Sequence, residues 1–109
     1  MPRRRKPRLR WAEPAANDLD SIRTYIAKDS PRNADRFIAR IRRAVANLRN
    51  FPFSGEVLAA DEDSELREIY VNSYRVIFRR RDDSILIIAV VHGARRLDLD
   101  GFGDVNETE

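Results

Sequence analysis

The sequence predicts an α+β fold with elements in the order β-α-α-β-β-β. Two apolar patterns with helical spacing lie between residues 13 and 49, and Ser30-Pro31 separates them. The second half contains three runs with strand character, of which residues 85–91 are apolar throughout. We therefore expect a hairpin of two helices on one face of a sheet, with the functional residues on the other face.

A single domain spanning residues 1–109 is expected, because a chain of this length forms one modest core. There is no cysteine, which excludes disulfides and thiolate metal sites, and we expect no metal or other cofactor. The longest apolar run, residues 85–91, is about a third of a membrane-spanning helix. A cytoplasmic protein without membrane contact is therefore expected.

Charge is distributed unevenly along the chain, whose net charge is +3. The first ten residues carry +6 and the last twelve −5, which leaves +2 for the body of the chain. We expect the basic arm, residues 1–8, and the acidic tail, residues 98–109, to be loosely held. The arm is a candidate for phosphate contacts, although a solvated terminus is the commoner role of such a run.

A short first strand is predicted at Arg8–Trp11, where polar and apolar residues alternate. A helix opens near Pro14, whose missing N–H needs no partner in a first turn. Ser30 is placed to cap a second helix and Pro31 to begin it. Each helix has one apolar stripe: Ala15, Leu19, Ile22 and Ile26 in the first, and Ala34, Phe37, Ile38, Ile41, Val45 and Leu48 in the second.

Three strands are predicted to follow a polar loop at residues 56–64. The first two, Leu66–Val71 and residues 74–80, are separated by the turn Asn72-Ser73. The third, residues 85–91, is apolar on both faces and rich in β-branched residues. This composition indicates a central strand that is covered on both sides.

Several short segments occur in a characteristic order and spacing: Trp11-Ala12-Glu13-Pro14-Ala15, Tyr25-Ile26-Ala27, Leu48-Arg49-Asn50-Phe51-Pro52, Leu66-Arg67-Glu68, Tyr74-Arg75-Val76-Ile77-Phe78 and Val91-His92-Gly93-Ala94-Arg95-Arg96. Together they resemble the RelE/ParE superfamily of toxin–antitoxin proteins, and most closely its ParE toxins. The resemblance spans residues 9 to about 96. It implies that the two-helix hairpin packs on a small, largely antiparallel sheet.

The resemblance also implies a growth-inhibiting toxin that is neutralised by a ParD-like antitoxin, a partner whose disordered segment folds on the toxin. In the ParE branch the implied target is DNA gyrase, and operator DNA is bound only through the antitoxin complex. In the RelE branch the implied activity is the ribosome-dependent cleavage of messenger RNA.

Cleavage of RNA without a metal would use His92, the only histidine, with Arg67, Arg75 and Tyr74 supplying charge and a hydroxyl. A histidine at the end of an apolar strand is more often a structural residue. The chain has two lysines and no tyrosine after Tyr74, which departs from the pattern of RelE-type nucleases. These features favour a toxin that is not an enzyme.

Target binding is assigned to Arg67, Tyr74, Arg75 and Arg95. Strand alternation predicts that Arg67 and Arg75 are neighbours on the uncovered face of the sheet, if the register allows it. The alternative is that these arginines pair with Glu68 or with the acidic loop. We expect an alanine at each of the four positions to leave folding intact and to reduce toxicity.

Antitoxin binding is assigned to Leu58, Phe53 and Tyr70, as part of a groove or a strand-addition site. The alternative is that these side chains cover the core below the end of the second helix. Two other functions remain open: a nucleic-acid-binding module that uses the basic arm, and a toxin that has become inactive.

Overall fold

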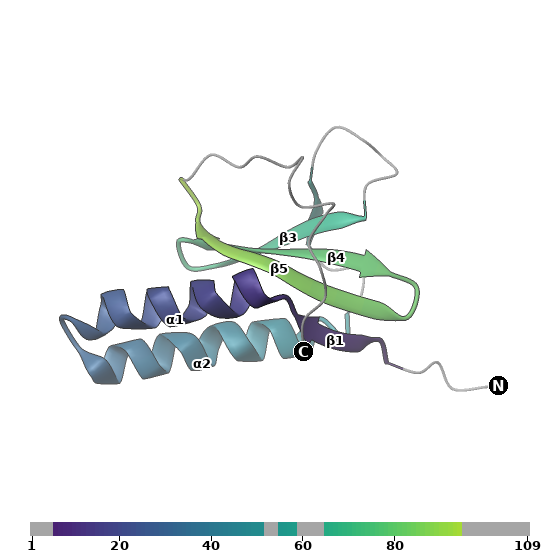
Figure 1. The fold of residues 1–109 in the computed structure, drawn as a ribbon. Helices are drawn as coiled ribbons and strands as arrows, with labels where there is room; N and C mark the ends of the chain where they lie inside the picture. The colour runs from purple at the N-terminus through teal and green to yellow at the C-terminus, as the bar shows by residue number, and fades with distance from the viewer. Residues whose placement is uncertain (1–5, 52–54, 59–64, 95–109) are drawn as a thin grey trace.

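The structure, a computed structural model, describes residues 6–51, 55–58 and 65–94. Its elements are β1 (Arg8–Trp11), α1 (Glu13–Ala27), α2 (Pro31–Asn47), β2 (Glu56–Val57), β3 (Leu66–Val71), β4 (Tyr74–Arg81) and β5 (Ser84–His92) (Figure 1). This order confirms the predicted α+β fold and adds one short strand, β2. No helix among the described residues is long and apolar enough to cross a membrane. The predicted acidic tail and most of the basic arm lie outside these residues.

Both helix starts follow from the local sequence. Pro14 lies in the first turn of α1, where its lack of an N–H is harmless. At α2, the Ser30 hydroxyl accepts a hydrogen bond of 3.2 Å from the Asn33 N–H, and Pro31 is the first helical residue. The cap satisfies one of the free amides at the helix start, which contributes about 1 kcal/mol.

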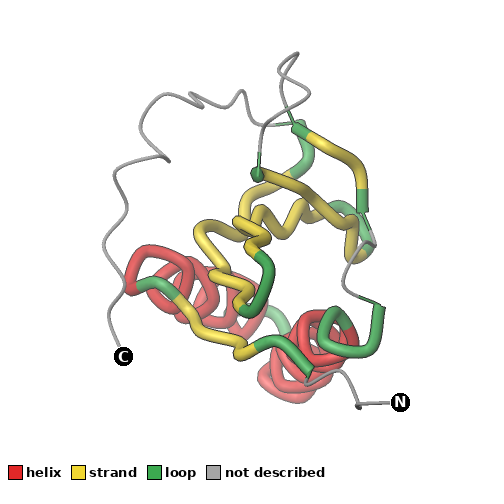
Figure 2. The backbone as a smooth tube through the Cα atoms, turned by 90° about the vertical axis from the view of Figure 1, so that its right-hand side faces the viewer, coloured by secondary structure: helices red, strands yellow, loops and turns green. Residues whose placement is uncertain are grey.

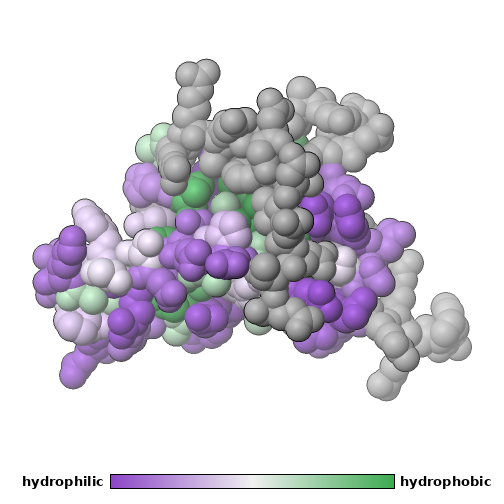
Figure 3. All heavy atoms as spheres, in the orientation of Figure 1, coloured by the Kyte–Doolittle hydropathy of each residue, from purple (hydrophilic) through white to green (hydrophobic). Residues whose placement is uncertain are grey.

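The two helices form the predicted hairpin and lie together on one side of the twisted sheet (Figures 1 and 2). Their apolar stripes face the sheet, and the outer surface of the hairpin is mostly hydrophilic (Figure 3). Most of the predicted stripe residues are buried: Ala15, Leu19 and Ile22 in α1, and Ala34, Ile38, Ile41, Val45 and Leu48 in or just after α2.

The sheet has the strand order β1-β5-β4-β3-β2. Strand β1 pairs with β5 in parallel. The connection between them runs through both helices and three strands, and it provides the long crossover that parallel strands require. All other neighbouring strands are antiparallel. This arrangement confirms the largely antiparallel sheet that the resemblance implies.

Strand β2 corrects the prediction of a polar loop at residues 56–64. Glu56 pairs with Glu68 and Val57 with Arg67, so β2 extends the sheet beyond β3. Two residues are too few to show alternation in a sequence, and this strand forms because the edge of β3 offers unpaired backbone groups. Residues 59–64 lie outside the described part of the chain.

Strand β5 lies between β1 and β4, and residues 85–91 are all buried. The helix side of β5 contributes Ile85, Ile87 and Val90 to the main core. At a register shift, Ala89 pairs with Ile77 and Ile87 pairs with Phe78, so the intervening residue has no partner and the usual alternation is broken at Ile88 and Ala89. Both pack on the opposite side of the sheet, in a second core cluster. The prediction of a strand that is buried on both faces is confirmed.

The second core cluster means that the face opposite the helices is not an open surface. It contains seven buried residues: Ala12, Leu58, Ile77, Leu86, Ile88, Ala89 and Val91. An apolar strand drives this burial, since each fully buried side chain of this size stabilises the fold by about 1.5–3 kcal/mol. Of the residues assigned to function from the sequence, Leu58 is one of these buried side chains.

Candidate functional site

An aromatic cluster joins α2 to the ends of β4 and β5. Tyr74 is the register partner of His92, and their rings meet edge to face at a centroid distance of 5.5 Å. On the other side of Tyr74, the ring of Phe37 lies 5.4 Å away and is tilted by 51°. Phe37 and Tyr74 are half-buried and His92 is exposed. The structure thus brings together two of the residues that the sequence assigned to function, Tyr74 and His92.

The imidazole of His92 is oriented by its backbone. Its Nδ1 accepts a hydrogen bond of 3.2 Å from the Ala94 N–H, so the neutral ring carries its proton on Nε2. With Nδ1 engaged and one ring edge against Tyr74, only Nε2 can approach a partner molecule. His92 is therefore held by structural contacts and still presents one polar atom to solvent.

The turn between β3 and β4 is fixed to α2 beside this cluster. Asn72 has a φ of +53°, a left-handed conformation that asparagine tolerates better than most residues. Its Oδ1 accepts a hydrogen bond of 3.2 Å from Nη1 of Arg40. The bond ties the turn to the helix and holds Tyr74, two residues later, against Phe37.

Arg75 lies on the opposite face of the sheet, next to Glu68. The Arg75 Nε donates a hydrogen bond of 2.6 Å to Glu68 Oε2, and Nη2 lies 2.5 Å from the same oxygen. Both side chains are largely buried, with exposed fractions of 14% for Arg75 and 9% for Glu68. The alternative prediction, in which an arginine pairs with Glu68, therefore describes Arg75.

The prediction that Arg67 and Arg75 share a face is wrong. The two-residue turn pairs Val71 with Tyr74, so an odd-numbered residue of β3 always faces an even-numbered residue of β4. Arg67 is opposite Phe78 and Arg75 is opposite Tyr70. The two arginines consequently point to opposite sides, and Arg67 donates instead to the Gly55 carbonyl at 3.4 Å.

The residues assigned to antitoxin binding differ in how exposed they are. Leu58 is 8% exposed and belongs to the second core cluster. Tyr70 is 60% exposed and lies opposite Arg75. Phe53, like the target-binding candidate Arg95, lies outside the described residues. Tyr70 is therefore the member of this set that the described part of the chain offers to a partner.

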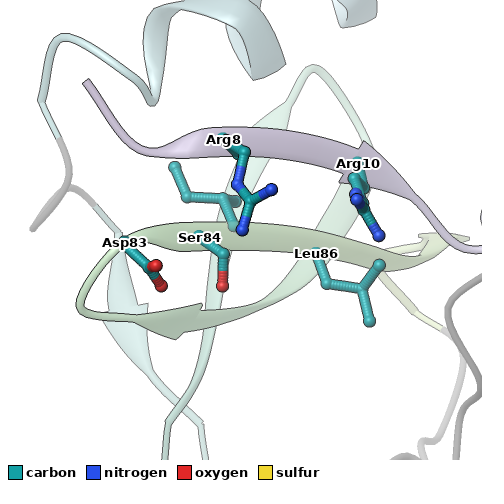
Figure 4. Close-up of a pocket in the computed structure, with 6 residues that line it drawn as sticks. Arg8, Arg10, Asp83, Ser84 and Leu86 are labelled. Carbon is teal, nitrogen blue, oxygen red and sulfur yellow. The ribbon is translucent and has the colours of Figure 1, made fainter. Parts of the chain in front are cut away.

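A small basic hollow of about 100 Å³ lies beside β1. Arg8 and Arg10 project over it from β1, and Ser84 and Leu86 lie across from them on β5 (Figure 4). Asp83 also lines the hollow, and its negative charge partly offsets the two positive charges. The hollow is remote from the aromatic cluster, since it lies at the opposite end of β5.

Comparison with known proteins connects this arrangement to one family. The family model described as "ParE toxin of type II toxin-antitoxin system, parDE" matches residues 9–97, which include both helices and all of the described strands except Arg8, the first residue of β1. The chain belongs to the ParE toxin family. The sequence-based assignment to the RelE/ParE superfamily, and within it to the ParE toxins, is thereby confirmed.

A relative of this ParE-family chain is the "Putative toxin Y4kP" of Sinorhizobium fredii, which is 37% identical over 90 residues. That alignment covers 80% of this chain and 91% of the relative. The fold is similar to a structure of the chromosomal ParDE toxin–antitoxin system from P. aeruginosa, with a TM-score of 0.67 and 21% identity over 80% of this chain and 96% of the other. It is also similar to the RelBE2 toxin–antitoxin complex from Mycobacterium tuberculosis, with a TM-score of 0.59 and 22% identity over 81% and 99% of the two chains. At these identities the structural likeness concerns the fold.

Two polar residues position the elements of this ParE-family fold: Asp18, which was given no packing role from the sequence, and Glu68, which was named there only as an alternative partner for the arginines. The carboxylate of Asp18 in α1 accepts a hydrogen bond of 2.9 Å from the Val90 N–H, next to the irregular pairing of β5. Glu68 is buried beside Arg75. For Asp18 a signal existed, because it falls on the apolar stripe between Ala15 and Ile22. A polar residue at a core position usually has a buried partner.

Proposed function

We propose that this ParE-family chain inhibits DNA gyrase and is neutralised by a ParD-like antitoxin. The observation that carries the proposal is the match to the ParE toxin family over residues 9–97. The chain would act by binding rather than by catalysis. Its partners would be the antitoxin, which blocks it, and gyrase, which it poisons.

The geometry favours this proposal over cleavage of RNA. A nuclease would need cations beside His92 to stabilise the charge that develops on the phosphate. Arg75 is engaged by Glu68 on the far face of the sheet, and Arg67 bonds the Gly55 carbonyl. Of the four residues in the nuclease hypothesis, only Tyr74 and His92 are in contact. Within the described residues, both arginines of the hypothesis are engaged away from the Tyr74 and His92 rings, and the rings are better suited to a contact surface.

Antitoxin binding is supported by the edge of the sheet at β2 and β3. Val57 and Tyr70 are exposed apolar side chains there, at 44% and 60%. An extended segment that pairs with the outer edge of β2 would lie near both side chains, which point to opposite faces of the sheet, and such strand addition is a common mode of peptide recognition. Replacing Tyr70 with Ser should then weaken the complex with the antitoxin and leave gyrase inhibition unchanged.

The decisive experiment measures the supercoiling of DNA by purified gyrase with this chain, and again after its antitoxin is added. We expect inhibition that the antitoxin relieves. His92→Ala should still inhibit gyrase, at most with a weaker contact, because no catalytic step depends on the imidazole. Growth arrest without gyrase inhibition, together with transcript cleavage that His92→Ala abolishes, would establish the nuclease alternative instead.

The aromatic cluster is tested separately by two substitutions at Tyr74. Tyr74→Phe keeps the ring contacts with Phe37 and His92 and removes only the hydroxyl. Tyr74→Ala removes the whole contact surface. If the cluster binds the target through its rings, the phenylalanine variant retains inhibition and the alanine variant loses it. Equal inhibition by both variants, with both folded, would exclude Tyr74 from the target contact.

A further inference from the structure

The solvent-facing side of α2 carries a line of three arginines with Ala39 between the second and the third. At 100° per residue, Arg32, Arg36 and Arg43 fall within about 40° of one another around the helix axis. They point away from the core stripe, and all three are exposed. The line extends about 16 Å along the helix. We refer to Arg32, Arg36 and Arg43 as the α2 arginine line.

These charges are not neutralised within the described part of the chain. None of the three arginines has a hydrogen-bond or ion-pair partner among those residues. The acidic residue nearest in sequence, Asp35, is engaged by Arg23 of α1, with its Oδ1 2.8 Å from Nη2. Arg40 lies beside the line and donates a hydrogen bond to Asn72, so it is not counted as part of the line.

The position of the line is unfavourable for the helix itself. Arg32 and Arg36 are four residues apart, which places two like charges side by side. Arg32 also lies in the first turn, next to the positive end of the helix dipole. Local stability therefore does not account for these arginines, whereas an external polyanion would.

We propose that the α2 arginine line binds the phosphate backbone of double-stranded DNA. The charge pattern fits a phosphate backbone better than a protein surface. Protein interfaces are centred on large apolar or aromatic side chains, and the residue between Arg36 and Arg43 on this face, Ala39, offers only a methyl group. Phosphate contacts require only cations and are independent of base sequence.

Duplex DNA is favoured over duplex RNA by the shape of the element. An α-helix is about 10–12 Å across and fits against the wide major groove of B-DNA, with its cations directed to the flanking phosphates. The deep, narrow major groove of A-form RNA does not admit such a helix. The inference extends beyond gyrase inhibition, because it concerns DNA alone and can be tested without gyrase or antitoxin.

The test is the fluorescence anisotropy of a labelled duplex of arbitrary sequence, titrated with the full chain at several salt concentrations. The variant R32Q/R36Q/R43Q removes three charges from the line. Its matched control, R3Q/R4Q/R5Q, removes the same charge from the basic arm. Glutamine preserves helix propensity, and circular dichroism of both variants checks that they are folded.

We expect the line variant to bind DNA about tenfold more weakly or worse at low salt, and its salt slope to fall by about 2–3. The arm variant should keep most of the affinity and of the slope. Equal losses in both variants, or a larger loss in the arm variant, would overturn the proposal, as would the absence of DNA binding by the wild type.

Two competing ligands complete the experiment. An RNA duplex of the same sequence should compete less effectively than DNA, and equal competition would overturn the choice of DNA. A peptide with the sequence of residues 98–109, which contains five acidic residues and no basic one, tests a protein partner. Displacement of DNA by micromolar peptide, lost in the line variant, would assign the line to an acidic protein segment instead.

Discussion

Glu68 and Arg75 form a buried ion pair on the sheet face opposite the helices, and this pair changes what a mutation at Arg75 reports. Removing one partner leaves the other charge buried and uncompensated. A loss of toxicity in Arg75→Ala would then reflect unfolding rather than a lost target contact. Alanine at Arg75 is therefore expected to destabilise the fold, contrary to the expectation from the sequence.

Arg75→Ala is predicted to lower the free energy of unfolding by about 3 kcal/mol, measured by urea denaturation. The double variant E68L/R75M should regain most of this loss, because no charge remains buried. Arg23→Ala is the matched control: it breaks the ion pair with Asp35, whose side chains are 50% and 63% exposed, and should change stability by less than about 1 kcal/mol. Wild-type stability of Arg75→Ala would contradict the prediction.

Asp18→Ala is predicted to destabilise the chain by about 1–3 kcal/mol, since the Val90 N–H loses its charged acceptor. The thermal midpoint should fall, and amide exchange at Val90 should accelerate. Asp20→Ala, an exposed position on the same helix, makes the same charge change and should have little effect. Equal effects of the two substitutions would indicate that helix charge, and not the hydrogen bond, is responsible.

The helices differ in how their exposed charges are arranged. In α1, Arg23 reaches across to Asp35 of α2. In α2, five arginines accompany the single acid Asp35, and Arg42 lies over the ring of Trp11 at 5.9 Å. The packed face of α2 stabilises the helix in spite of the repulsion on its outer face. The packing of α2 therefore tolerates a charge pattern that by itself destabilises the helix.

Replacing the α2 arginine line should consequently stabilise the free protein. R32Q/R36Q/R43Q removes two like-charge pairs at a spacing of four residues, Arg32–Arg36 and Arg36–Arg40, each worth about 0.2–0.5 kcal/mol, and a cation from the first turn, worth about 0.3–1 kcal/mol. The thermal midpoint is expected to rise at low salt and to converge with the wild type at 1 M salt, where charges are screened. R3Q/R4Q/R5Q should show no such rise. A fall in the midpoint of the line variant would mean that the arginines make stabilising contacts.

The molecule as a whole is organised around β5, which contributes to both core clusters and pairs with β1, the first strand of the chain, and with β4, the strand before it. Strand β2 is at the opposite extreme, with two exposed residues at the edge of the sheet. Strands that connect the cores of a fold open only when the whole domain unfolds, whereas edges open locally.

Hydrogen exchange should therefore be slowest in β5 and fastest in β2. Amides of residues 85–91 are predicted to exchange with the free energy of global unfolding, and their rates should fall together when the protein is stabilised. The amides of Glu56 and Val57 should exchange by local opening and be insensitive to global stability. Slow exchange in β2 of the free chain would show that the edge is protected and is not available for strand addition.

The sequence by itself determined the elements whose signals are local. Four features follow from the spacing of residues close together in the chain: the cap at Ser30, the prolines in the first helical turns, the apolar stripes of both helices, and β5, which is apolar on both faces. The family was also readable from the sequence, because it depends on the order and spacing of such segments.

Only the tertiary structure decided which polar residues meet. The odd–even pairing across Asn72-Ser73 separates Arg67 from Arg75, and it brings Arg75 to Glu68 instead. The same is true of β2, which exists because β3 presents a free edge. Strand register, sheet edges and buried ion pairs depend on contacts between segments that are distant in sequence, and no local pattern specifies them.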